Sequence, residues 1–421
     1  MNLLIKNARV IDPNSPFNSQ SADIFIENGT IKKIGKALSV KADKEILVDG
    51  LCISPGWVDM FANFADPGYE YKESIETGSM AAAAGGFTDV LVIPNTKPVA
   101  DNKSQVEYIV HKSRSLPVNI HPIGAVTKNT EGKELAEMYD MRSSGAVAFG
   151  DGINCIQSSG LLVKALQYVK AFDGVIIQLP DDKSINAHGL MHEGVVSTQI
   201  GLPGKPAMAE ELIVARDIKL ARYADSKIHF TGISSKKSLE YVNRGKAGGI
   251  NVSCSVTPYH LYFTDEDLES YDSNLKVNPP IRTAEDREAI KKAVKDGTID
   301  CIATHHMPHE ADSKETEFEY AKNGMTGLET AYAVLKTSMP DMDDEKWVEL
   351  LAVNPRKLLG LNNAAIKENE EACITLFVPG QEWVYDKSNV QSKSKNSPFI
   401  GKTLTGKVIG IINKDKVHLN P

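Results

Sequence analysis

The chain has 421 residues, of which 42% are hydrophobic and 24% are charged, proportions typical of a large globular protein. Its formal net charge is −8 with both signs interspersed, which argues against a nucleic-acid-binding surface. The five cysteines are scattered without a CxxC pair, so we predict reduced, buried thiols rather than a zinc knuckle or redox centre. No apolar leader and no apolar run of about 18 residues occurs, so we expect a cytoplasmic chain without membrane contact.

Both ends of the chain carry short segments that alternate between apolar and polar residues, the pattern of half-buried strands. These segments are Leu3–Ile11, Asp23–Glu27, Thr30–Ile34, Ala372–Val378 and Gly406–Ile412. The pair Asn28-Gly29 indicates a tight hairpin turn between the second and third of them. We therefore predict a small β-sandwich domain composed of residues 1–53 together with residues 363–421.

Residues 54–362 show a repeating rhythm of strands and helices. Eight strand-like runs end near Phe61, Ile93, Ile123, Phe149, Ile177, Phe230, Val256 and Ala303. Helical patterns lie between most of them, at Ile75–Ala84, Gln157–Ala171, Ala207–Tyr223, Lys237–Asn243 and Glu285–Val294. Eight strands alternating with helices predict an α/β fold, a (β/α)₈ barrel of the TIM type, whose active site lies at the carboxyl ends of the strands.

Sequence motifs in the order found in one enzyme family run through nearly the whole chain. They are Asp66-Pro-Gly68, Pro94-Asn-Thr-Lys-Pro98, Gly201-Leu-Pro-Gly-Lys-Pro-Ala-Met-Ala-Glu-Glu211, Ala215-Arg-Asp217, Lys276-Val-Asn-Pro-Pro-Ile-Arg282, Gly297-Thr-Ile-Asp300, Gly327-Leu-Glu-Thr330 and Ser392-Lys-Ser-Lys-Asn-Ser-Pro-Phe-Ile-Gly401. On these motifs the chain resembles the type I dihydroorotases of the zinc amidohydrolase superfamily. Hydantoinases and allantoinases share that fold, but the Asn-Pro-Pro-Ile-Arg and Gly-Leu-Glu-Thr pieces favour dihydroorotase.

The resemblance implies six metal-ligand positions at the barrel mouth, and five of them carry other residues in this chain. Phe61 and Asn63 stand where the family has two histidines, which share a metal because alternate residues of a strand point the same way. Gln178 and Gly232 stand at the positions of two further histidines. His305 replaces an aspartate that handles the proton while metal-bound hydroxide attacks the ring amide of the substrate.

Asp151 is the only ligand position that keeps its residue, in a Phe-Gly-Asp-Gly motif one residue shorter than the family's. We interpret the set as a zinc site that has lost its function, and we expect no cofactor. The alternative is a rebuilt site with one metal held by Asp151, His305 and water. His306 is a poor additional ligand because neighbouring strand residues face opposite sides, and His229, which precedes the ligand position, is expected to face away.

The resemblance also identifies positions that bind substrate in the family. Ala65 replaces an arginine that binds the substrate carboxylate, so a bidentate charge-assisted contact is lost. Asn95, Asn278 and His309 remain at other substrate positions. Each also has a structural interpretation, because asparagines shape turns and a histidine can persist where a loop packs around it.

Three functional hypotheses follow from these residues. The leading one is a non-catalytic dihydroorotase homologue of pyrimidine synthesis that works in an oligomer, as a structural or regulatory partner of aspartate carbamoyltransferase. This partner is implied by the resemblance, since dihydroorotases of this type associate with that enzyme. The second is an active dihydroorotase or related cyclic-amide hydrolase, which would require zinc in an atypical site. The third is a ligand sensor that binds without turnover.

Overall fold

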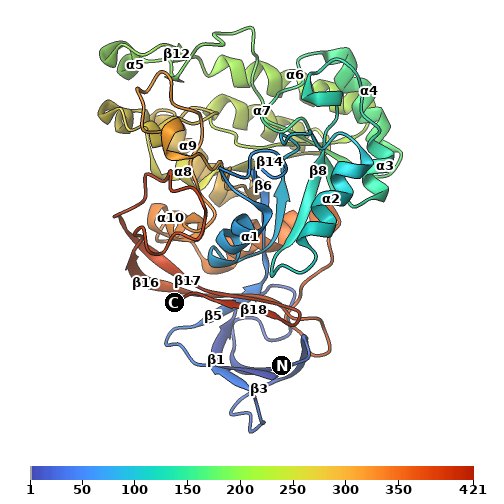
Figure 1. The fold of residues 1–421 in the computed structure, drawn as a ribbon, viewed down its shortest axis with the longest axis vertical. Helices are drawn as coiled ribbons and strands as arrows, with labels where there is room; N and C mark the ends of the chain where they lie inside the picture. The colour runs from blue at the N-terminus through green and yellow to red at the C-terminus, as the bar shows by residue number, and fades with distance from the viewer. Residues whose placement is uncertain (1) are drawn as a thin grey trace.

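The computed structural model describes residues 2–421 and contains two large sheets, each of eight strands. The first is parallel, in the order β15-β14-β13-β10-β9-β8-β7-β6, and a bridge between Ala62 and His306 joins its two edges. The sheet therefore closes into a (β/α)₈ barrel, which confirms the predicted fold class. Figure 1 shows the barrel surrounded by helices, with the second sheet below it near both chain termini.

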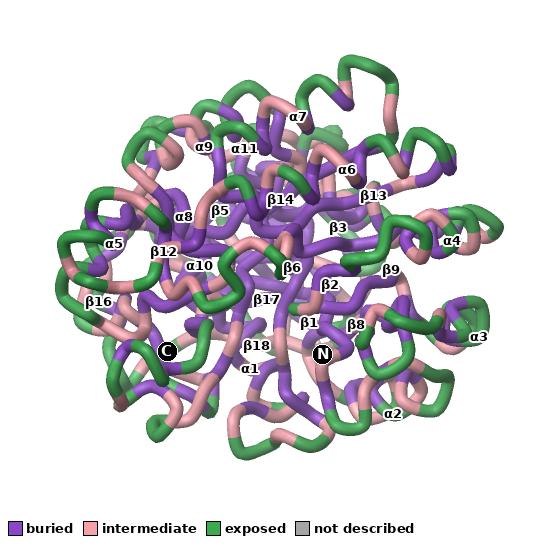
Figure 2. The backbone as a smooth tube through the Cα atoms, turned by 90° about the horizontal axis from the view of Figure 1, so that it is seen from above, coloured by how far each residue is buried: buried purple, intermediate pink, exposed green. Residues whose placement is uncertain are grey.

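The barrel strands are short and almost wholly buried, as expected for parallel strands covered by helices outside and filled by side chains inside. They are β6 (Trp57–Ala62), β7 (Phe87–Val92), β8 (Asn119–Gly124), β9 (Ala148–Phe149), β10 (Val175–Gln178), β13 (Lys227–Phe230), β14 (Val252–Val256) and β15 (Cys301–Ile302). Each ends within one residue of the predicted position. Figure 2 shows the buried strands at the centre and exposed loops and helix faces at the periphery.

Twelve α-helices connect the strands or follow the barrel in the described chain. They are α1 (Ile75–Ala84), α2 (Lys103–Ser113), α3 (Met138–Ser143), α4 (Ser159–Lys170), α5 (Val195–Ile200), α6 (Met208–Ala224), α7 (Lys236–Ala247), α8 (Pro258–Tyr262), α9 (Ala284–Asp296), α10 (Ala331–Ser338), α11 (Asp344–Val348) and α12 (Asn354–Leu359). Serine N-caps fix several helix starts, because their hydroxyls accept the otherwise unpaired amide hydrogens of the first turn. Ser74 caps α1 and Ser158 caps α4 in this way.

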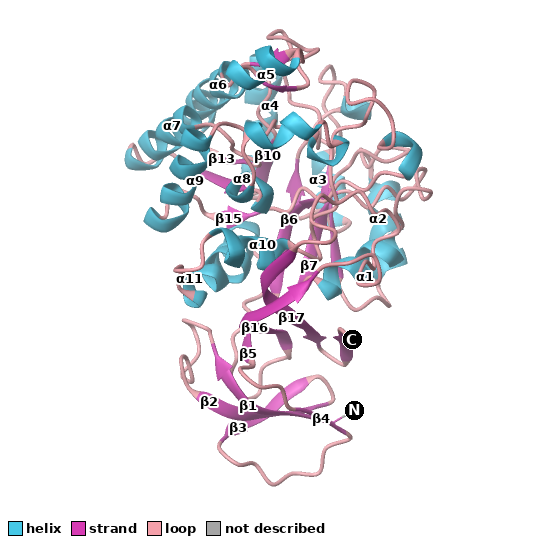
Figure 3. Ribbon diagram, turned by 90° about the vertical axis from the view of Figure 1, so that its left-hand side faces the viewer, coloured by secondary structure: helices cyan, strands magenta, loops and turns pink. Residues whose placement is uncertain are grey.

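The second sheet is mixed and is built from both ends of the chain, in the order β18-β17-β16-β5-β1-β2-β3, with β4 paired to β1 (Figure 3). Its strands are β1 (Asn2–Val10), β2 (Ser21–Glu27), β3 (Thr30–Gly35), β4 (Lys44–Ile46), β5 (Cys52–Pro55), β16 (Cys373–Val384), β17 (Thr403–Asn413) and β18 (Lys416–Leu419). The predicted turn at Asn28-Gly29 is confirmed, since both residues have a positive φ (49° and 76°). A short pair, β11 (Met191–His192) and β12 (Gly204–Lys205), lies apart from both sheets.

A buried ion pair joins the amino-terminal end of the barrel strands to the segment that leads back to the second sheet. The Arg356 guanidinium lies 2.6 Å from Asp89, and it also donates to the carbonyl of Gly56. Burial alone would raise the pKa of Asp89, but Arg356 and His121 together hold it well below its usual range. The pair thus anchors α12 to the first two barrel strands.

All five cysteines are free, and four of them are buried, so the predicted reduced thiols are confirmed. Burial raises the pKa of these thiols, which leaves them protonated and poorly reactive. Within residues 2–421, no helix combines the length and the apolar character needed to cross a bilayer.

Candidate functional site

Aromatic packing fills the barrel mouth at the position of the expected first metal ligands. Phe61, at the end of β6, is 1% exposed, and its ring centroid lies 4.6 Å from that of His305. Asn63 points its amide oxygen at the backbone N–H of Ala65, 2.8 Å away, and so closes a local turn. The two residues of the expected histidine pair therefore serve packing and loop geometry.

Gly232 and His305 form a matched pair across the mouth. A Cβ atom at Gly232 would lie 2.5 Å from Cε1 of His305, closer than real Cβ contacts allow. Both residues have a left-handed backbone, with φ of 69° and 46°. The imidazole of His305 therefore occupies the space into which a side chain at position 232 would extend.

One ring nitrogen of His305 and both carboxylate oxygens of Asp151 already have hydrogen-bond partners. Nε2 of His305 lies 2.8 Å from the hydroxyl of Thr231, and burial lowers the pKa of the imidazole to about 3, so the ring is neutral. Asp151 accepts from the backbone N–H of Thr127 at 2.9 Å and from its hydroxyl at 2.5 Å. Burial raises the pKa of Asp151 to about 6 despite these hydrogen bonds.

Gln178, at the end of β10, is buried, and both polar atoms of its side-chain amide form hydrogen bonds within the protein. Its amide nitrogen donates to Asp217 at 3.0 Å, and its oxygen accepts from the N–H of Ile156 at 3.3 Å. Among residues 2–421, no three His, Cys, Asp or Glu side chains are grouped so that they could hold a metal ion. The donors present at the mouth therefore do not fit the zinc ions that the resemblance implies.

The other two histidines of interest have hydrogen-bonding roles. His306 lies beyond the last strand, where its Nδ1 accepts the backbone N–H of Gly327 at 3.2 Å and its Nε2 lies 3.5 Å from Glu73. His229 does not simply face away, as the sequence suggested. It contacts Ser253 and Ser255, and Ser255 donates to Thr231, so hydrogen bonds link His229 to the Thr231 hydroxyl that contacts His305.

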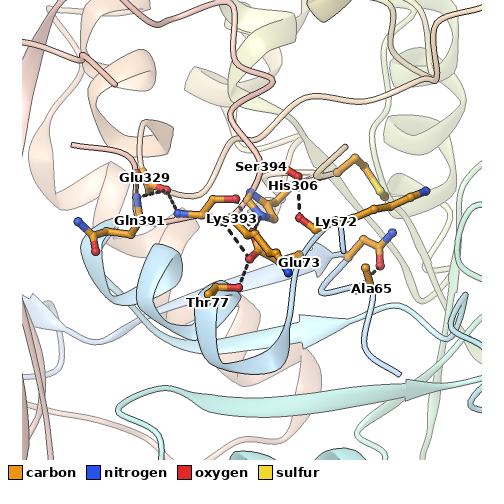
Figure 4. A network of polar contacts seen from close by, with 12 residues as sticks. Ala65, Lys72, Glu73, Thr77, His306, Glu329, Gln391, Lys393 and Ser394 are labelled. Carbon is orange, nitrogen blue, oxygen red and sulfur yellow. Dashed lines mark hydrogen bonds and ion pairs between the residues drawn. The ribbon is translucent and has the colours of Figure 1, made fainter. Parts of the chain in front are cut away.

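Figure 4 shows the polar network around His306, in which the carboxylates of Glu73 and Glu329 hold the carboxyl-terminal tail against the barrel. Glu73 accepts from the hydroxyl of Ser392 and from the N–H of Lys393. Burial alone would raise the pKa of Glu73, but His306 and its other donors lower it. Glu329 similarly accepts the N–H groups of Gln391 and Ser392. The tail motif identified in the sequence is therefore a strap across the barrel.

The three retained substrate positions do not line one cavity. Asn95 binds the loop after β9, accepting from the N–H of Ile153 at 3.0 Å and donating to the carbonyl of Asp151 at 3.2 Å. His309 borders a hollow beside the tail, where its Nε2 donates to the carbonyl of Asn323. Only Asn278 lines the cavity at the barrel mouth. Ala65 is buried and offers no polar group there.

The mouth cavity has a volume of about 310 Å³, and its charged lining was not predicted from the sequence. Asp181, Lys183 and Lys205 contribute the charges, and His305 is also part of the wall. Lys205 lies inside the Gly201–Glu211 motif, and Asp181 follows the end of β10, a position where barrel enzymes place functional residues. Strand-end position was the signal that could have identified Asp181.

The pairing of Gly232 with His305 predicts a non-additive double-mutant cycle. Gly232→Ala should destabilise the protein by more than the roughly 1–2 kcal/mol that a left-handed alanine costs, because its methyl meets the His305 ring. In a His305→Ala background this additional loss of stability should disappear, and equilibrium urea denaturation of the single and double variants measures it. Gly249→Ala is the matched control, since Gly249 has φ of 72° and open space around it. Additive effects of the two substitutions would contradict the packing described.

Comparison with known proteins identifies relatives over the full chain. A family model described as dihydro-orotase-like matches residues 50–238. The dihydroorotase of Syntrophus aciditrophicus is 42% identical over 414 residues, 97% of each chain, and that of Geotalea daltonii is 42% identical over 421 residues, 99% of each chain. Among solved structures, an L-hydantoinase (dihydropyrimidinase) from Arthrobacter aurescens superposes with a TM-score of 0.86 at 24% identity, covering 99% of this chain and 96% of that one. The structural match supports the fold alone.

Proposed function

The chain belongs to the dihydroorotase family, and we propose that it is a protein of pyrimidine synthesis that does not hydrolyse dihydroorotate. One observation carries the proposal: the His305 ring fills the space beside Gly232 and packs on Phe61, where the family is expected to place metal ligands. This ring packing occupies the space through which a side chain at position 232 would reach a metal ion.

Hydrolysis of a cyclic amide near neutral pH needs an activated nucleophile, and zinc supplies it by lowering the pKa of bound water. Zinc sites of this kind need three or four protein donors in fixed geometry. In this chain Asp151 is committed to Thr127 and His305 to Thr231. The two side chains together fall short of the three or four donors that such a zinc site needs, and on this ground we assign the barrel a non-catalytic role.

A second candidate, the active enzyme, is favoured by a different observation. Relatives named dihydroorotase are 40–43% identical to this chain over at least 96% of its length, and this favours hydrolysis of dihydroorotate more directly than it favours a non-catalytic role. An active site in this chain would need a zinc centre built from other donors, or a rearranged mouth. The two candidates differ in zinc content and turnover.

We predict that the protein purified from zinc-supplemented cultures contains less than one equivalent of zinc and shows no dihydroorotate hydrolysis. Elemental analysis and a hydrolysis assay with added zinc measure both quantities. The dihydroorotase of Geotalea daltonii, purified in parallel, is the positive control. Stoichiometric zinc together with turnover that a chelator abolishes would establish the second candidate instead.

Restoring the first two histidines alone should not create activity. In the double variant Phe61→His with Asn63→His, positions 178, 232 and 305 still lack their expected ligands, and residues that act as a unit are strongly non-additive. The variant should also lose stability, because Phe61 is buried against His305. Zinc content, hydrolysis and urea denaturation of the variant test these statements. Measurable hydrolysis would mean that more of the site remains than its side chains suggest.

The role that we propose for this barrel is an oligomeric partner of aspartate carbamoyltransferase, in keeping with the family. We expect the two proteins from one organism to form a complex at micromolar concentrations, with an interface of about 1,600 Å². Sedimentation velocity on the mixture and on each protein alone measures this association. Separate sedimentation, with carbamoyltransferase activity unchanged after deletion of this gene, would refute the partnership.

A further inference from the structure

A second cavity, the hollow beside the carboxyl-terminal tail, has a volume of about 460 Å³, within the range of pockets that bind small molecules. Its walls come from Tyr71 ahead of α1, from residues 273–274, from residues 309–315 in the loop after β15, and from Lys387 and residues 393–396 of the tail. Among residues 2–421, none lines both this hollow and the mouth cavity. Binding in the hollow is therefore a question separate from the chemistry at the mouth.

The lining of this hollow is rich in positive charge, although the chain as a whole has a net charge of −8. Four lysines line it against two carboxylates, namely Lys314, Lys387, Lys393 and Lys395 against Glu310 and Glu315. The Lys393 ammonium donates to the carbonyl of Glu70, as part of the strap (Figure 4). Within residues 2–421, the exposed ammonium groups of Lys387 and Lys395 have no hydrogen-bond or ion-pair partner. They are therefore able to bind an anion in the hollow.

Lys314 is a buried positive charge without a counter-charge. The residue is only 4% exposed, and its ammonium donates to the carbonyls of Lys322 at 2.8 Å and Gly324 at 2.9 Å. An ammonium group has three donors, so one remains. Among residues 2–421 no carboxylate forms an ion pair with it, whereas buried lysines are usually paired. Burial lowers the pKa of Lys314 to about 7, which reflects the cost of this unbalanced charge.

We propose that the hollow binds a small anion that carries two or more phosphate groups. Lysine ammonium groups suit phosphate, because each is a point charge with several donors. Lys314 places one charge in the buried wall, and Lys387 and Lys395 place two more at the exposed surface. An anion with several separate charges meets more of these lysines than a single phosphate does. It also joins the tail to the loop after β15, because both segments line the hollow.

Calorimetric titration of the intact protein with four probes tests the ligand class. The probes are inorganic tripolyphosphate, ATP, inorganic phosphate and citrate, in a buffer free of divalent cations and at about 0.15 M ionic strength, which screens distant surface charges. The tighter of the two polyphosphates should bind at least about tenfold more strongly than phosphate or citrate. Tighter binding of ATP would identify a nucleotide as the source of the phosphates, and tighter binding of tripolyphosphate an inorganic source. Equal binding of citrate or of phosphate, or no binding of either polyphosphate, would overturn the proposal.

A pair of double variants tests the contact with the exposed lysines. Lys387→Gln with Lys395→Gln should weaken binding of the tighter polyphosphate by about tenfold, the sum of two exposed charge contacts. Lys164→Gln with Lys219→Gln is the matched control, because it removes the same charge from exposed positions on α4 and α6. The control should leave affinity unchanged. Equal weakening by the two double variants would show only a general attraction to positive charge and would overturn the site.

Lysine footprinting locates the anion in the protein without any substitution. Acetic anhydride modifies accessible lysines, and mass spectrometry gives the rate at each one. The tighter polyphosphate, at saturation, should slow the modification of Lys387 and Lys395 and leave the rates at Lys164 and Lys219 unchanged. Equal protection of all four lysines, or of none, would contradict binding in the hollow. Lys314→Met should also weaken binding, and if that variant does not fold, the footprint and the exposed pair still decide.

Discussion

A closed eight-stranded barrel has an interior just wide enough for side chains, so each inward position must be filled by something. In this chain that constraint is met at the mouth by Phe61 and His305, whose rings pack together, and by Gly232, which makes room for the imidazole. The three residues depend on one another, because a side chain at position 232 requires the ring of His305 to move. Filling the centre in this way leaves the open volume further out, between Asp181, Lys205 and Asn278.

Most of the fold was predictable because local patterns and the global architecture agree. The run Val175–Gln178 is wholly buried, as a parallel strand covered on both sides must be, and helix α1 has the predicted bounds. The amino-terminal hairpin was visible in Asn28-Gly29, which the turn geometry requires. Closure of the barrel was less visible, since it depends on a single bridge at His306, beyond the last regular strand. The periodicity of apolar residues along the sequence does not predict a single contact of that kind.

The site was predictable only as a set of residue types at strand ends. The family resemblance drew attention to Phe61, Gly232 and His305, but their mutual packing joins segments far apart in the chain and emerges only in three dimensions. The same limit applies to Asn95 and His309, which do not line the mouth cavity but hydrogen-bond to the backbone of Ile153 and Asn323, two residues that do. The cytoplasmic location and the oligomeric state stay predictions.

High identity to dihydroorotases and the predicted loss of metal ligands are compatible, because they depend on different residues. Identity over a whole chain is dominated by positions that maintain the fold, whereas catalysis by a metal centre depends on a few donors acting together. The network around Glu73 is an example of residues that maintain the fold. His306 and Ser392 hold the tail strap against the barrel, and neither lines the mouth cavity. Phe61, Gly232 and His305 contact one another and lie outside this network, so a change of residue at the mouth leaves the contacts of the strap in place.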